Sequence, residues 1–253
     1  MQAVTRLLYF VVFTLTEYAR SGRILIEALA SLVAFYIFFR HTASTMLPSY
    51  FFGTAGLLLV VLTFYTTTSI MGLGDRPQGY MVLVRRIGRS GYLLGLYVAA
   101  LLVELGVYGI ICLAVVLLNP IPTMGLRDWL LGTLPLILNV MLLGSLLTLL
   151  APIVLTSGWR LLILAIVAIA FSGNLISGQP SSSLWQPLAT ALNILRTIFS
   201  TPLLPAFSGF ALSVSRDYSG FGVAILIAQL SLTLSMLALA SYAFARRELI
   251  FNS

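Results

Sequence analysis

Two acidic residues inside long apolar segments are the side chains best placed to do chemistry. Glu104 lies 13 residues after Gly91, and Glu27 lies four residues after Arg23. An acid deep in a membrane needs a partner, a water-filled cavity or a bound proton. We expect Glu104, with Asn139 of another apolar run, to line a pathway or a subunit interface, although structural hydrogen bonding would also explain Glu104. Glu27 is expected to pair with Arg23 near the membrane surface.

Other polar residues in the apolar runs carry weaker signals. Asn139, Ser145 and Thr148 share one run, and a Thr-Thr-Thr-Ser cluster at 66–69 closes another. Serine and threonine can bond the backbone of their own helix, so we expect most of these side chains to be structurally neutral.

Several kinds of chemistry are excluded by composition. The chain has one cysteine (Cys112), one histidine (His41) and no lysine. An intrachain disulfide and a Cys/His metal site are therefore excluded. A phosphate-binding loop of the form G-x-x-x-x-G-K-[ST] and a Schiff-base photoreceptor both require lysine. His41 lies at the mouth of an apolar segment, which argues against an intramembrane serine protease. We expect no catalytic or metal-binding residues and no cofactor bound by this chain.

The composition points to a membrane as the solvent that positions these residues. Apolar residues make up 60% of the 253 residues and charged residues 8%, against about 25% charged in soluble domains. A membrane-spanning helix needs roughly 20 apolar residues. We therefore expect one all-α transmembrane domain over 1–253, with six spans at about 24–40, 51–72, 91–118, 129–153, 160–177 and 220–244.

The arginines predict the orientation. All 14 basic residues are arginine, and they are spread between apolar segments, so the net charge of +7 indicates membrane topology rather than nucleic-acid binding. With the N-terminus inside, ten arginines are cytoplasmic and four are external. We expect a multi-pass protein of the cytoplasmic (inner) cell membrane with both termini inside. The external four are Arg40, Arg127, Arg196 and Arg216.

The apolar stretch near the N-terminus, Leu7 to Leu15, is too short to span the membrane. We expect an interfacial helix over about 1–22, because polar side chains recur at helical spacing there. The alternative is a signal peptide cleaved near Ala19-Arg20-Ser21. The expected interfacial anchors are Arg6, Arg20, Arg23 and Glu27.

The segment between spans two and three has the signals of a short helix. Asp75 is suited to cap it, Pro77 to its first turn, and Arg85, Arg86 and Arg89 to its end. These arginines enforce topology in any case. A helix parallel to the membrane would in addition offer a docking element for a cytoplasmic partner.

The external segment 176–219 contains apolar pieces broken by prolines, each too short to cross. We expect re-entrant or surface helices over about 184–212. A seventh span is the competing interpretation, but it would place Arg246 and Arg247 outside.

This organisation resembles the type-2 permease subunits of ATP-binding cassette (ABC) exporters. The closest local similarity is Asp75-Arg76-Pro77-Gln78-Gly79 followed by 85–95, RRIGRSGYLLG, and the ending Ala245 to Leu249 is also similar. The resemblance implies an elbow helix, a coupling helix at about 75–89 and re-entrant outer helices. It implies that the ATPase-docking residues are Asp75, Arg76, Gln78, Gly79, Arg85, Arg86 and Arg89.

The resemblance also implies a division of labour. The chain would form an export pathway with a second permease subunit, identical or not, within the membrane lipid, while separate ABC ATPase subunits bind ATP and Mg. The chain would not be an enzyme by itself. An ion- or proton-coupled secondary transporter and a non-transporting membrane assembly subunit remain as alternatives, and the substrate stays open.

Overall fold

The computed structural model describes residues 2–40, 46–75, 88–122, 124–155, 158–161, 194, 197 and 204–246, and this part of the chain is helical with no strand. Four of its helices are long and apolar enough to cross a membrane, and a bent pair at the N-terminus makes a fifth candidate. These helices indicate a multi-pass membrane protein. Their order is α1 (Gln2–Arg20), α2 (Arg23–Ala34), the π-helical turn η1 (Phe35–Phe39), α3 (Pro48–Gly74), α5 (Arg89–Leu118), α6 (Leu126–Leu149), α10 (Leu204–Ser215) and α11 (Gly222–Arg246).

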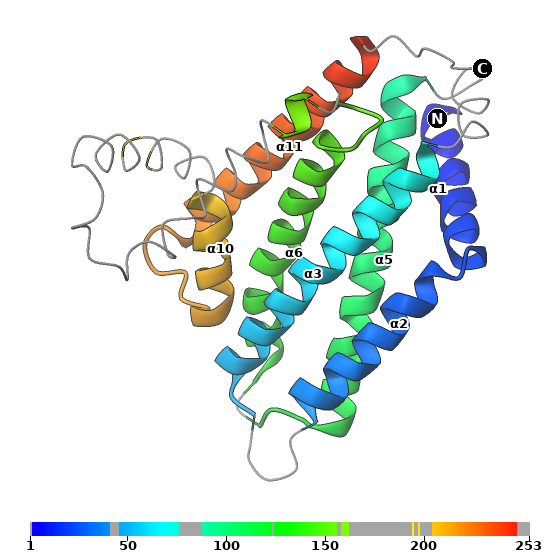
Figure 1. Ribbon diagram of the computed structural model, residues 1–253. Coiled ribbons are helices and arrows are strands. Elements are labelled where there is room, and N and C mark those ends of the chain that lie inside the picture. Colours follow the sequence, from blue (N-terminus) through cyan, green and yellow to red (C-terminus); the bar gives the residue numbers. More distant parts are fainter. Residues whose placement is uncertain are drawn as a thin grey trace, which may run out of the picture.

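The long helices pack side by side in one bundle (Figure 1). Helix α3 crosses both α5 and α6, α11 packs on α6 and α5, and α10 lies against α6, α11 and α3. The ends of α3 and α11 and the start of α5 lie at the upper end in Figure 1. The end of η1, the end of α5 and the starts of α3 and α6 lie at the lower end.

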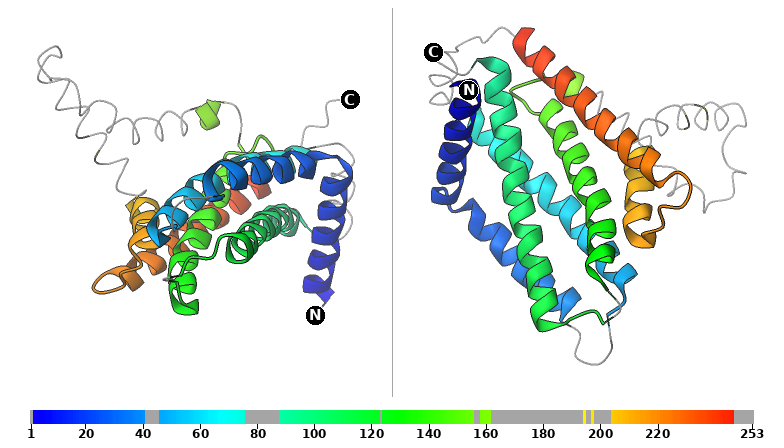
Figure 2. Two further views of the ribbon diagram at one scale, coloured as in Figure 1. Left: turned by 90° about the horizontal axis from the view of Figure 1, so that it is seen from below. Right: turned by 180° about the vertical axis from the view of Figure 1, so that it is seen from behind.

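The N-terminal helix pair is sharply bent. Val4–Arg20 and Arg23–Phe39 meet at 73°. Gly22 stands between them at φ 75°, a left-handed conformation that glycine adopts without strain. Seen along the bundle, α1 runs away from the layer of other helices (Figure 2). It nevertheless docks on α5, because Gly95 leaves room for the ring of Phe10, which lies 4.9 Å from the Tyr92 ring.

Two apolar clusters fill the interior, one toward each end of the bundle. On α3, Leu59 belongs to the lower cluster and Ile70 to the upper one. On α5, Tyr108 belongs to the lower cluster and Ala100 to the upper one. The segments of α3 and α5 between these residues carry buried polar side chains, so the apolar core is interrupted at mid-height.

The helices agree closely with four of the predicted spans, and the first span matches in position a helix that is long and apolar enough to cross only together with α1. The spans expected at 51–72, 91–118, 129–153 and 220–244 correspond to α3, α5, α6 and α11, and that at 24–40 to α2 with η1. The expected fifth span at 160–177 lies almost wholly outside the described residues. So do most of the loop at 75–89 and the part of the outer region before α10.

Candidate functional site

Glu27 is buried where α1, α2 and α3 meet. Its side chain is 1% exposed. The hydroxyl of Tyr18 donates a hydrogen bond to Oε1 at 2.5 Å, and the hydroxyl of Thr66 donates to the same oxygen. Oε2 has no partner among the described residues. The expected pairing with Arg23 is wrong, because the Arg23 guanidinium donates instead to the Ser69 carbonyl at 2.8 Å.

Glu104 lies at the middle of α5, 15 residues after its start and 14 before its end. It is also 1% exposed. The Thr67 hydroxyl donates to Oε1 at 3.2 Å, and Oε2 has no partner in the described part of the chain. Since adjacent residues of α3 hold the two acids, their separation is fixed by that helix.

A second polar pair joins α6 to α11. Gln229 is fully buried and donates a hydrogen bond from Nε2 to Oδ1 of Asn139 at 2.7 Å. Asn139 also lines a cavity of about 20 Å³, and Thr63 of α3 lines the same cavity. The hydroxyl of Thr63 is buried and has no hydrogen-bond partner among the described residues. The cavity is large enough for one water molecule, but the rest of its described lining is glycine and apolar side chains, so it offers few hydrogen-bond partners.

These side chains form an oblique belt across the bundle, from α1 to α11. We call it the polar belt, and it consists of Tyr18, Glu27, Thr63, Thr66, Thr67, Glu104, Asn139 and Gln229.

The chemistry open to the polar belt is set by its two acids. No cation contacts either carboxylate in the described structure, and two bare negative charges so deep in an apolar interior are strongly unfavourable. Each carboxyl therefore needs a bound proton or a shared small cation. No group of three or more His, Cys, Asp or Glu side chains gathers among the described residues, so a multivalent metal site is not indicated there. The belt can bind and release protons and can align helices by hydrogen bonding.

The upper end of the bundle holds the two ends of the 75–88 loop together. The Tyr92 hydroxyl donates to the Gly74 carbonyl at 2.8 Å, which joins α5 to the end of α3. The Arg89 guanidinium donates to the Ala245 carbonyl at 2.8 Å, which joins α5 to the end of α11. Asp75 is exposed at the C-terminal end of α3.

The remaining predicted site residues divide between surface and undescribed positions. Arg6 and Arg20 are exposed on α1, and Arg23 is half-buried at the start of α2. Five of the proposed docking residues lie outside the described part of the chain: Arg76, Gln78, Gly79, Arg85 and Arg86.

Sequence reasoning singled out Glu104 and Asn139 but missed Gln229 and the role of Tyr18. Gln229 was detectable, since an amide inside an apolar span seeks a partner across helices. Tyr18 was not, because its contact with Glu27 depends on the bend at Gly22. Comparison of the chain with protein-family models, with curated proteins and with solved structures found no match.

Proposed function

We propose that this chain is the permease subunit of an ATP-driven export complex of the ABC type, with ATP hydrolysis by separate subunits. The observation that carries the proposal is the bent N-terminal pair. Helix α1 meets the first span at 73° and exposes apolar residues, among them Leu8, Val12 and Phe13. An amphipathic helix lying along the interface has this form. The elbow helix of the permease subunits that the sequence resembles is such an element.

Two further features are consistent with this proposal. The segment 75–88 connects the end of α3 to the start of α5, which are held together by Tyr92, and Arg89 at its end bonds the C-terminal end of α11, so a partner bound there would act close to these helix ends. The apolar helix α10 has only 12 residues, too few to cross a bilayer, and it packs against α6 and α11 just before the last span. A short helix so placed suits a re-entrant outer segment.

The sequence contains no lysine, which the G-x-x-x-x-G-K-[ST] phosphate-binding loop requires, and this supports the assignment of ATP hydrolysis to separate subunits. In the proposed complex, ATP and Mg bind to ATPase subunits on the cytoplasmic side, and two permease subunits enclose the pathway. The upper end in Figure 1 is then cytoplasmic, which places Arg89 and Arg246 inside and Arg40, Arg127 and Arg216 outside, as the arginine bias predicts.

The test is purification of the tagged chain from its native membrane in a mild detergent, followed by identification of what accompanies it. A stoichiometric ATP-binding subunit is the expected result. Substitution of Arg85 and Arg86 by alanine should release that subunit while membrane insertion stays unchanged. The matched control is Arg127→Ala, at the opposite end of the bundle, which should retain it. Intact protein that carries no ATPase, even after crosslinking in the membrane, would overturn the proposal.

A gradient-driven transporter is the second candidate, and the polar belt is the observation that favours it. Glu27 and Glu104 each keep one buried oxygen without a partner in the described structure, as a proton-binding acid would. If no ATPase is found, proton uptake by the purified protein, compared with Glu104→Gln, becomes the measurement to make. A non-transporting assembly subunit would show neither ATP hydrolysis by an attached subunit nor proton uptake.

A further inference from the structure

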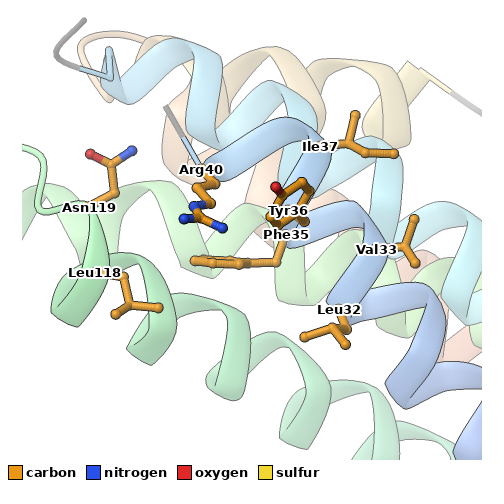
Figure 3. Close-up of a pocket in the computed structure, with 8 residues that line it drawn as sticks. All are labelled: Leu32, Val33, Phe35, Tyr36, Ile37, Arg40, Leu118 and Asn119. Atoms are coloured by element: carbon orange, nitrogen blue, oxygen red, sulfur yellow. The ribbon is translucent and has the colours of Figure 1, made fainter. Parts of the chain in front are cut away.

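A groove of about 800 Å³ opens between the first span and the end of α5, at the lower end of the bundle. Its volume lies within the range typical of small-molecule sites, roughly 300–1,000 Å³. Figure 3 shows Arg40, Phe35 and Leu118 facing the gap between η1 and α5. The groove is lined by Leu32, Val33, Phe35, Tyr36, Ile37, Arg40, Leu118 and Asn119.

The shape of the groove follows from the π-helical turn. The wider turn buries Phe39 completely, where it packs on Phe51 with ring centroids 5.5 Å apart. The backbone amide of Arg40 bonds back to the Phe35 carbonyl, five residues earlier. Asn119 of the other wall lies at the same end as Arg40, and its side-chain amide donates to the Phe39 carbonyl at 2.8 Å. The two walls are thus joined by a hydrogen bond from a side chain to the backbone.

The lining is apolar except at one edge. Leu32 and Leu118 are 66% and 72% exposed, so long hydrocarbon surfaces are left bare along the groove. At its edge the Arg40 guanidinium stacks on the Tyr36 ring, 4.9 Å from the ring centroid. No hydrogen bond or ion pair engages that guanidinium within the described residues. None of the described residues that line the groove is acidic, so no carboxylate among them compensates the positive charge of Arg40 at this edge.

We propose that this groove binds one anionic phospholipid of the leaflet at the lower end. The phosphate accepts hydrogen bonds from Arg40, whose planar guanidinium suits a phosphate, and an acyl chain lies along Leu32, Phe35 and Leu118. A second copy of the chain fits the groove less well. It would bury the charge of Arg40 against a lining with no acid to compensate it. The inference does not depend on whether the chain exports a substrate.

The test is lipid titration of the full-length protein in a neutral detergent. Native mass spectrometry counts phosphatidylglycerol bound per protein, with phosphatidylcholine as the comparison lipid. One saturable phosphatidylglycerol is expected, bound more tightly than phosphatidylcholine. Arg40→Gln should weaken that binding about tenfold or more, because a charge-assisted hydrogen bond is lost. Arg40→Lys should weaken it less.

Two control variants separate the groove from general charge attraction. Arg127→Gln makes the same change of charge at an exposed position of the same end, outside the groove, and should leave binding unchanged. Leu118→Trp fills the groove while Arg40 is retained, and should weaken binding as well. Equal losses in Arg40→Gln and Arg127→Gln, or no preference between the two lipids, would overturn the proposal. A lipid-free dimer that Leu118→Trp abolishes would assign the groove to a second copy instead.

Discussion

Gly209 of α10 lies so close to Gln229 of α11 that no side chain fits between them. A Cβ atom at position 209 would lie 1.9 Å from Nε2 of Gln229 and 2.6 Å from its Cδ. Carbon contacts are favourable at roughly 3.5–4 Å. Gly209→Ala must therefore displace the buried amide and break its 2.7 Å hydrogen bond to Asn139.

The expected loss of stability is about 2–4 kcal/mol, from overpacking together with the lost interhelical hydrogen bond. The assay is reversible unfolding in mixed detergent micelles. Adding Gln229→Ala to Gly209→Ala removes the obstructed side chain, so the two substitutions should be coupled by about 1–2 kcal/mol in the compensating direction.

The matched control is Gly106→Ala on α5, where an added Cβ meets nothing within 4 Å. That substitution should leave stability unchanged or raise it slightly, because alanine favours the helix. If Gly209→Ala is as stable as Gly106→Ala, or if the double variant is no better than additive, the packing of α10 on α11 is not as described. The link of α10 to the polar belt would then fail as well.

Three further predictions concern the polar belt and the loop between α10 and α11. Glu104→Gln should change the free energy of unfolding by less than about 1 kcal/mol if the native carboxyl carries a proton. Glu104→Arg should abolish monodisperse protein in detergent. A large loss of stability in Glu104→Gln would indicate a bound cation instead. Tyr18→Phe removes the donor to Glu27 and should cost about 1–3 kcal/mol, measured as faster hydrogen exchange along α1; unchanged exchange would contradict it. Hydrogen bonds from the side chain and backbone of Ser219 hold the pKa of Asp217 below its ordinary value of 3.8. The stabilisation that the Asp217 carboxylate gives to the loop is therefore present above pH 3.8 and is lost as the pH falls through the lower, folded-state pKa. An NMR titration should show this pH dependence, and Asp217→Asn should remove it.

The spans could be predicted because their signal is local. Crossing a bilayer requires a fixed length of apolar chain, and the segments that became α3, α5, α6 and α11 each meet it. The same principle identified Glu104 as a buried acid in need of a partner. It could not identify Thr67 as that partner, because the pairing depends on how α3 crosses α5.

The threonine cluster at the end of α3 shows where local reasoning stopped. Backbone bonding was expected for these hydroxyls, and Thr68 does bond the carbonyls of Phe64 and Tyr65. Thr66 and Thr67 instead reach Glu27 and Glu104 on other helices. Successive residues of a helix point about 100° apart, so 66 and 67 face the interior while 68 faces outward.

The contacts at the upper end decide which helices can move separately. Leu96 leaves no room for a side chain at Gly74, and the Tyr92 hydroxyl bonds the same residue. The upper ends of α3 and α5 are thereby held as one unit, and the bond from Thr67 to Glu104 holds the same two helices together at mid-height. A partner acting on the 75–88 loop, as in the proposed complex, would therefore displace α3 and α5 together. The relative motion must then fall on the contacts of this pair with the other helices, α1, α2, α6, α10 and α11. Glu27 of α2, which accepts a hydrogen bond from Thr66 of α3, lies at one of these boundaries, whereas Glu104 lies within the pair.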